Sequence, residues 1–347
     1  MNRKAHATRR GDCRIVALLA IIAAWPTPLR ADDVATFYKG RTVSFVVGHE
    51  VGTGYDLYGR ILARHIGRHI PGEPAVVPQN MIGGGGLHSA NWLYNIAPGD
   101  GSVVAIFAHT AILEPVLGSS GVKLDATRFH WLGNMDETVS TCVIATRTGV
   151  NTLDELLARE TLYGGSGGPL SVFGAAMINL LGAKGRLIQG YKGSADIKLA
   201  IVRGEVEATC GLSRSTLGSQ WRDELTAGNV KPVVQFGRKP HPALANVAHV
   251  YAHARSDEDA QVFDLIFGAT SLGRPLAAAP ATPRDRVKAL RAAFEATMRD
   301  PHFQADAEKA RLDIAPSSGE AVQSLVSRFY ASPQHVVERA KAASRPR

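Results

Sequence analysis

The chain has 347 residues, of which 45% are hydrophobic and 20% charged, with 35 Gly and 18 Pro. This ordinary globular composition excludes a disordered or collagen-like chain, and the length predicts about two domains. Outside the first 31 residues no apolar run approaches the ~18 residues of a membrane-spanning helix, which excludes a membrane-spanning body.

Residues 1–31 have the pattern of a cleavable signal peptide. A basic start precedes the apolar stretch from Ile15 to Trp25, which is too short to cross a bilayer, and Pro26 ends it. Cleavage after Ala31 removes six basic and one acidic side chains, so the formal net charge falls from +8 to +3. We therefore expect a secreted protein, and no basic patch remains to support a nucleic-acid partner.

The elements that follow alternate between strands and helices. Thr42–Val47 predicts a buried strand, the next turn contains Gly52 and Gly54, and Asp56 is expected as the N-cap of a helix that ends near Ile70. Further strands are expected at 75–78, 103–107, 142–145, 161–163, 206–209 and 232–236, and further helices at 87–94, 168–181 and 195–203. This order predicts an α/β fold with a largely parallel sheet.

Helix-start signals occur in the middle and the last third of the chain. Thr152 and Glu155 form a capping box, and Ser318 begins an amphipathic helix. Thr282 is expected as the cap of a long helix with Pro283 at its first position. The last third is therefore predicted to be mainly helical.

Glycine-rich turns between strands and helices are the main functional pattern. At a helix N-terminus backbone N–H groups are unpaired and the helix dipole is positive, so several such turns in one cleft can hold an anion. The candidate turns are 52–54, 83–86 and 164–168. Each turn alone is equally explained as a tight connection. They contain neither a P-loop nor a complete G-x-G-x-x-G, so we expect no nucleotide cofactor.

One turn allows an alternative from another class, a secreted serine hydrolase. Gly164–Gly168 matches G-x-S-x-G with Ser166 at its centre, and Asp264 and His302 follow as candidate triad partners. In so glycine-rich a segment the match carries little information, and Ser166 can instead hydrogen-bond a ligand or cap the helix. His65 and His69, four residues apart without the Glu of a zinc protease motif, are interpreted as a solvated helix face, so no metal is expected.

Cys142 and Cys210 are the cysteines outside the signal segment. An even pair in an oxidising compartment favours one disulfide, and the alternative is two buried thiols that pack as small apolar side chains. No C-x-x-C spacing is present. A thiol metal site or redox motif is therefore unsupported.

Short segments, taken in order, resemble the periplasmic receptors of tripartite tricarboxylate transporters, the Bug family. They are Val43–Asp56, which ends in Gly-Thr-Gly-Tyr-Asp, Val77–Met81, Ala97–Gly101, Tyr191–Gly193, Gly204–Glu207 and Pro240–Leu244. The resemblance runs from about Phe37 to Ser332, and the ordered set is more specific than any one segment.

The resemblance implies a two-lobed periplasmic-binding-protein fold, type II-like, with the ligand cleft between the lobes. Residues 32–137 plus 239–347 would form lobe one and residues 138–238 lobe two. It also implies a monomeric periplasmic receptor that has no enzymatic activity and no cofactor. Such a receptor captures a small carboxylate and delivers it to membrane permease subunits.

The resemblance also implies a set of ligand-binding residues. They are Gly52, Thr53, Gly54 and Asp56 in the first turn, His109 and Thr110 after a later strand, Gly165, Ser166 and Gly167 in lobe two, and Ser213 and Ser215 beyond them. Arg214 lies between these serines and is expected to pair with a second ligand carboxylate. The chain departs from the family pattern where Glu50 and Val51 replace a common Pro, and Glu50 is an unusual neighbour for an anion. The sequence does not identify the carboxylate.

Overall fold

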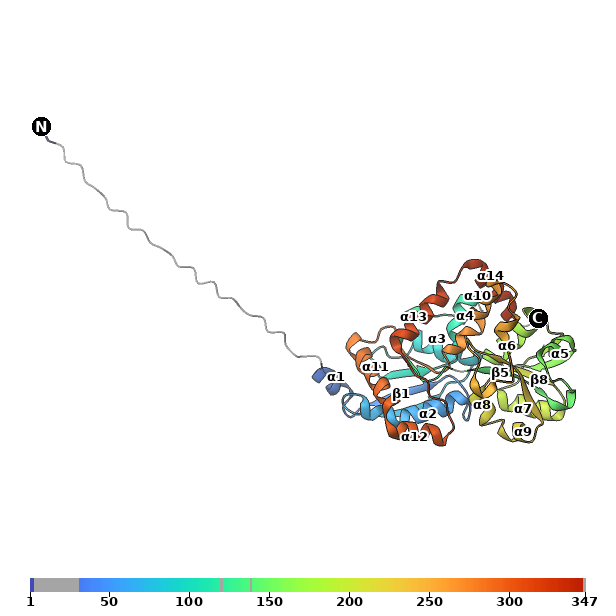
Figure 1. The fold of residues 1–347 in the computed structure, drawn as a ribbon. Coiled ribbons are helices and arrows are strands. Elements are labelled where there is room, and N and C mark those ends of the chain that lie inside the picture. The colour runs from blue at the N-terminus through green and yellow to red at the C-terminus, as the bar shows by residue number, and fades with distance from the viewer. Residues whose placement is uncertain (3–30, 119–120, 138, 346–347) are drawn as a thin grey trace.

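The computed structural model describes residues 1–2, 31–118, 121–137 and 139–345, so the expected signal peptide lies almost entirely outside the described residues. Two six-stranded sheets lie side by side, each with helices packed against it, and form two lobes (Figure 1). This arrangement confirms the predicted α/β, two-lobed architecture. In the part of the chain that is described, no helix is long and apolar enough to cross a membrane.

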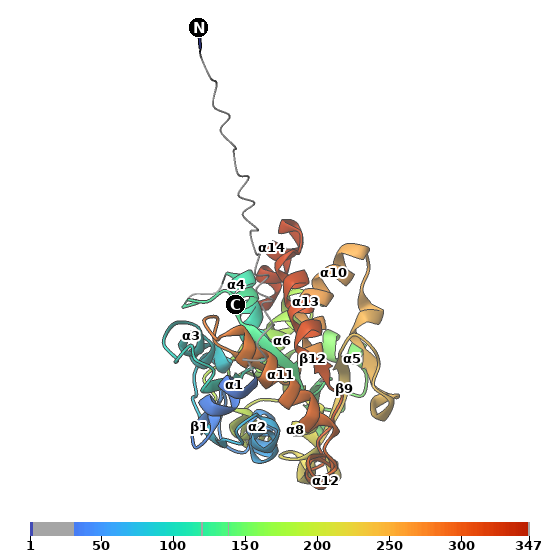
Figure 2. The same ribbon diagram turned by 90° about the vertical axis from the view of Figure 1, so that its left-hand side faces the viewer.

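The first sheet has the strand order β12-β4-β11-β3-β1-β2. Its strands are β1 (Thr42–Val47), β2 (Ala75–Asn80), β3 (Val103–Ile106), β4 (His130–Asn134), β11 (Pro275–Ala278) and β12 (Ser317–Ser318). Helices of this lobe are α1 (Ala31–Tyr38), α2 (Gly54–Ile66), α3 (Leu87–Asn95), α4 (His109–Leu117), α11 (Arg284–Arg299), α12 (Pro301–Lys309) and α13 (Gly319–Tyr330). Helices α2 and α12 pack side by side (Figure 2). Phe45 and Val47 on one face of β1 and Val46 on the other are all buried, as expected for a strand covered on both faces.

The second sheet has the strand order β10-β9-β5-β8-β6-β7. Its strands are β5 (Ser140–Ala145), β6 (Thr161–Gly164), β7 (Gly185–Ile188), β8 (Ala208–Ser213), β9 (Val230–Phe236) and β10 (Ala248–His249). Its helices are α5 (Leu153–Ala158), α6 (Gly168–Asn179), α7 (Ser194–Arg203), α8 (Arg214–Gly218) and α9 (Arg222–Thr226). Because β10 still belongs to this sheet, the chain pairs here beyond residue 238. The exact division into lobes stays a prediction.

Both sheets are mixed, so the expectation of a largely parallel sheet is wrong. Strand β5 is antiparallel to both β8 and β9, and β11 is antiparallel to both β3 and β4. Neither strand follows a crossover helix of its own sheet: β5 comes from the first lobe, and β11 follows helix α10 (Asp257–Ile266) after the chain leaves the second sheet. Only a crossover within one sheet imposes the parallel direction.

A continuous core and the last helix connect the two lobes. Phe173 of α6 packs on Phe236 and Phe267, with ring centroids 5.1 Å away in each case, and the same hydrophobic cluster includes Phe107 of the first lobe. Helix α14 (Gln334–Ser344) contacts α4, α6 and α10 (Figure 1). The lobes are therefore joined by packing as well as by the chain connections from β4 to β5 and from β10 to β11.

The structure confirms some helix starts and corrects others. The capping box of Thr152 and Glu155 is present, and Ser318 caps α13. Helix α2 begins at Gly54 with Thr53 as its N-cap, so the prediction of Asp56 as the cap is wrong. The sequence pattern placed Gly54 in the turn, whereas Gly54 is the first residue of the helix and Thr53 comes directly before it. Helix α11 likewise starts one residue late, with Pro283 rather than Thr282 at the N-cap.

Candidate functional site

A pocket of about 350 Å³ lies between the lobes and is lined by both. The first residues of several helices reach it, including Gly54 of α2, His109 of α4, Pro169 of α6, Ser194 of α7 and Thr216 near the start of α8. Because each helix start carries unpaired N–H groups and the positive end of a dipole, their convergence favours an anion. The glycine turns of 83–85 and 167 line the same pocket.

Arg274 supplies a buried cation to this pocket. The side chain is 1% exposed, and its guanidinium lies 4.3 Å from the ring centroid of Tyr55 and 4.7 Å from that of Tyr58. Its Nη2 donates to Ser215 Oγ at 2.9 Å and reaches Ser213 Oγ at 3.4 Å. Arg274 precedes β11 of the first lobe and the serines belong to the second, so this guanidinium bridges the lobes at the wall of the pocket.

His109 has unused hydrogen-bonding capacity. It is 2% exposed, and neither ring nitrogen has a hydrogen-bond partner among the described residues. Burial, with the positive charge of Arg274 and the neighbouring His49, lowers the pKa of His109 to about 3. The ring is therefore neutral near pH 7 and offers one donor and one acceptor. Buried polar groups are nearly always paired, so an unpaired ring at a pocket wall points to a ligand.

Half of the predicted site residues meet at this pocket and the other half lie behind or beside it. Those that line it are Thr53, Gly54, His109, Ser166, Gly167 and Ser213. Those that do not line it are Gly52, Asp56, Thr110, Gly165, Arg214 and Ser215. The predicted turns therefore come together, while several individual side chains serve the structure around them.

Asp56 holds the first turn in shape. It is 1% exposed and accepts hydrogen bonds from Gly52 N at 2.8 Å, Arg60 Nε at 2.9 Å and Asn80 Nδ2 at 2.8 Å. Burial by itself raises the pKa of this carboxyl, but the three hydrogen bonds outweigh it and hold the pKa below its ordinary value. Its interactions are thus directed at the turn rather than at the cleft.

The other residues behind the pocket are packed into the fold. Thr110 is 4% exposed, and Gly165 is buried and donates its N–H to the carbonyl of Ile188 at 2.9 Å. The carbonyl of Gly52 accepts from Gln220 Nε2 of the second lobe at 2.8 Å. Gly52 therefore takes part in a contact between the lobes.

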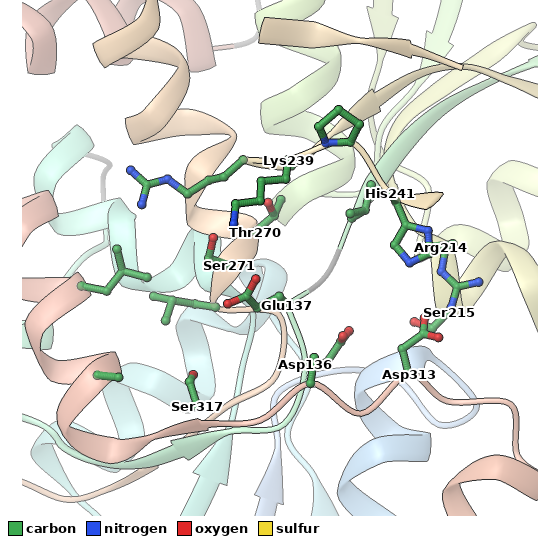
Figure 3. Close-up of a pocket in the computed structure, with 18 of the residues that line it drawn as sticks. Asp136, Glu137, Arg214, Ser215, Lys239, His241, Thr270, Ser271, Asp313 and Ser317 are labelled. Carbon is green, nitrogen blue, oxygen red and sulfur yellow. Dashed lines mark ion pairs between the residues drawn. The ribbon is translucent and has the colours of Figure 1, made fainter. Parts of the chain in front are cut away.

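Arg214 and Ser215 line a different pocket, of about 550 Å³, on the side of the segments that cross between the lobes. Figure 3 shows Arg214 facing Asp313 at one edge, with Lys239 and His241 across from Asp136 and Glu137. Arg214 is ion-paired with Asp313, and Arg238 is ion-paired with Asp264. These two cations are therefore already neutralised by the protein.

A serine-hydrolase triad is not assembled around Ser166. Asp264 accepts from Tyr251 OH at 2.9 Å and from Arg238 Nη2 at 2.8 Å, and His302 is exposed on α12. Neither residue lines the pocket that Ser166 lines. Gly167, not Ser166, is the N-cap of α6. No cluster of metal-ligating side chains occurs within the described ranges.

His65 and His69 do not form the solvated face expected for them. His65 is 5% exposed and its Nε2 lies 2.8 Å from Asp306 Oδ2, while His69 Nε2 lies 3.0 Å from Asp300 Oδ2. Helix α12 covers this side of α2, and a single sequence gives no sign of that distant partner.

Cys142 and Cys210 are joined by a disulfide between the paired strands β5 and β8. Both side chains are completely buried in the second lobe. The bond ties the two central strands of that lobe together, and one of them, β8, ends at Ser213.

Sequence reasoning missed Arg274 and His49 as pocket residues. Arg274 lies in no motif, and its pocket neighbours Gly54 and Ser213 are far away in the sequence. The glycine run 83–86 was recognisable in the sequence, but its close approach to the second lobe was not. The backbone of Gly85 lies so near Gly168 that a Cβ on Gly85 would be 2.5 Å from the Cα of Gly168.

No protein-family model matches the sequence, and no curated protein matches it. Solved structures do. The periplasmic binding protein BugD is 20% identical, covers 87% of this chain and 97% of its own, and has a TM-score of 0.68. MatC from Rhodopseudomonas palustris with bound malate is 17% identical over 86% of this chain and 99% of its own, with a TM-score of 0.66. An R. palustris protein with adipate is 19% identical over 87% and 97%, also with a TM-score of 0.66. The chain therefore has the two-lobed α/β fold of these periplasmic binding proteins.

Proposed function

We propose that this protein is a periplasmic solute receptor that captures a small carboxylate between its lobes and delivers it to a tripartite tricarboxylate-type membrane permease. The observation that carries the proposal is the convergence of helix starts from both lobes on a pocket that also contains Arg274 and the unpaired His109. The malate and adipate in two structures of this fold support the ligand class.

In this proposal one ligand carboxylate lies beside Arg274. The guanidinium and nearby hydroxyls such as Thr216 Oγ1 donate to it, together with backbone N–H groups at the start of α2. Leu170 and Leu212 line the same pocket and would contact the apolar part of the ligand. Because the wall comes from both lobes, a ligand that contacts both stabilises the closed arrangement.

The role is that of a receptor and not of an enzyme. Catalysis needs a positioned nucleophile, base or acid, and this pocket offers hydrogen-bond donors around Ser166 without the triad partners. A fluorophosphonate should leave Ser166 unlabelled. Covalent labelling of Ser166 would instead favour the hydrolase alternative.

A thermal-shift panel of small carboxylates, with native mass spectrometry of the purified protein, tests the proposal. A ligand at about 100 times its Kd adds about 2.7 kcal/mol of stability, which raises the melting temperature by several degrees. Stabilisation by neutral sugars alone would contradict the carboxylate assignment.

A pair of arginine variants locates the site. Arg274→Lys should abolish the shift, because a lysine lacks the planar fork that matches a carboxylate. Arg328→Lys changes an exposed residue of the other pocket and should leave the shift unchanged. Equal shifts in both variants would place the ligand away from Arg274.

The periplasmic location is part of the same proposal. Mass spectrometry of protein from a periplasmic extract should show a mature chain that begins after Ala31. A full-length chain that stays in the cell would contradict the predicted signal peptide.

A further inference from the structure

Glu50 extends from the first lobe into the same pocket and meets the start of α7 in the second lobe. Its backbone carbonyl accepts from Thr53 N at 3.3 Å and from Thr53 Oγ1 at 2.8 Å, which fixes the residue in the first turn. A Cβ on Gly193, the N-cap of α7, would lie 2.5 Å from Glu50 Oε2. The carboxylate therefore lies directly against this helix start.

A second carboxylate of the protein already occupies the same helix start. Asp196, in the first turn of α7, accepts from the backbone N–H of Lys192 at 3.3 Å. Burial raises the pKa of Glu50, the charge of Asp196 raises it further, and Lys192 opposes both. Two carboxylates therefore lie close to each other beside this end of the pocket, and Lys192 is the cation that acts on Glu50.

Arg274 makes its contacts with other residues of the pocket than Glu50 does. Arg274 contacts Ser213 and Ser215, and its guanidinium lies against Gly54. The charged neighbours that shift the pKa of Glu50 are Asp196 and Lys192. A ligand that spans the pocket thus meets a cation at one part and a carboxylate at the other.

We propose that Glu50 makes this receptor selective for monocarboxylates by excluding a second ligand carboxylate from the part of the pocket beside α7. A helix start normally attracts an anion. Here the carboxylates of Glu50 and Asp196 take that place, so a second ligand carboxylate meets like charge. The inference rests on the proposed function, because it concerns the far end of a ligand whose first carboxylate lies beside Arg274.

Acids matched in chain length test the exclusion. Isothermal titration calorimetry at pH 7.5 would compare hexanoate with adipate and butanoate with succinate on the wild-type protein. The monocarboxylate of at least one pair should bind about tenfold more tightly than its dicarboxylate, which equals about 1.4 kcal/mol. Glu50→Gln should tighten dicarboxylate binding about tenfold and change monocarboxylate binding less than about threefold.

Two further variants make the result specific. Glu50→Ala should act like Glu50→Gln, which separates the charge from any new hydrogen bond of the amide. Glu137→Gln makes the same chemical change at an exposed residue of the other pocket and should not alter either affinity.

The outcomes separate this inference from the function on which it rests. Wild-type protein that binds adipate and succinate as tightly as hexanoate and butanoate, or Glu50 variants that gain no dicarboxylate affinity, would overturn the exclusion and leave the carboxylate receptor intact. Failure of all four acids to bind, when only solutes without a carboxylate do bind, would overturn the receptor assignment and this inference together.

Discussion

Gly54 lies against the guanidinium of Arg274, so closely that a Cβ on the glycine would come within 2.8 Å of Nη2. The same Cβ would lie 3.1 Å from Thr216 Oγ1. Gly54 is not among the residues with positive φ, so the backbone accepts alanine and the conflict is one of space. The guanidinium of Arg274 can therefore pack against the first turn of α2 only because position 54 has no side chain.

Gly54→Ala should displace the Arg274 guanidinium and weaken carboxylate binding by at least about tenfold, or about 1.4 kcal/mol, while the circular dichroism spectrum stays that of the folded protein. Titration calorimetry with the best acid of the panel measures the loss. Gly218→Ala is the matched control, because a Cβ at Gly218 meets no atom within 4 Å. Unchanged affinity in folded Gly54→Ala would move the carboxylate site away from Arg274.

Asp56→Ala should act on stability more than on binding. It removes the carboxylate that accepts from the N–H of Gly52, from Arg60 Nε and from Asn80 Nδ2, which costs about 1–3 kcal/mol of unfolding free energy. Urea unfolding measures the loss, and affinity should fall less than in Gly54→Ala. A variant as stable as the wild type would show that the buried carboxylate does not hold the turn.

The same carboxylate predicts a pH dependence. Because the folded pKa of Asp56 is lowered, its contribution is fully present above the unfolded pKa of about 3.9 and is lost as the pH falls through the folded pKa. Below that pH, wild type and Asp56→Ala should therefore converge in stability. A difference that stays constant down to pH 2 would contradict the assignment.

His109 also predicts that stability is lost as the pH falls, and this loss begins at a higher pH than the loss expected from Asp56. An unfolded histidine titrates near 6.5, whereas the folded pKa is about 3, so the unfolded state binds one more proton between these values. The contribution of His109 is fully present above pH 6.5 and declines by up to about 1.4 kcal/mol per pH unit as the pH falls toward 3.

His109→Gln should remove this part of the slope when unfolding free energies are measured by urea titration from pH 4 to 7. His335→Gln, at an exposed site on α14, is the control and should keep the wild-type slope. Parallel curves for wild type and His109→Gln would show that the imidazole is not buried in its neutral form.

The Cys142–Cys210 bond predicts the thiol content of the mature protein. Unfolded, unreduced protein should show no reactive thiol, and reduction should release two. Because the two cysteines are 68 positions apart in the sequence, the chain-entropy model gives roughly 4 kcal/mol of stabilisation. Two free thiols before reduction would rule out the bond, and the double variant Cys142→Val, Cys210→Val should unfold at a lower urea concentration.

Much of the fold could be predicted because its signals are local. The buried run Thr42–Val47 became β1, and the capping box at Thr152 and the cap at Ser318 start α5 and α13 as expected. Strand direction was predicted less well, because β5 and β11 take their direction from connections outside their own sheet.

The site divides in the same way. Gly54 and Gly167 belong to turns that are recognisable in sequence, and the structure brings both to one pocket. Arg274 joins them only through long-range folding. It is a lone basic residue in the sequence, and no periodicity or motif marks it as part of a site. Arg214 was predicted to pair with a ligand carboxylate in the cleft. In the structure it forms an ion pair with Asp313 of the other lobe and does not line the cleft pocket.

The backbone contact between Gly85 and Gly168 has a consequence for how the lobes meet. Gly85 has φ +62°, and the nearest atoms to its would-be Cβ are main-chain atoms of Gly168, which has φ +53°. At this point the two halves of the molecule touch through bare main chain, with no side chain between them. A side chain of any size at position 85 would clash with the backbone of Gly168 and keep the two lobes farther apart. This glycine pair therefore allows the closest approach of the lobes beside the pocket.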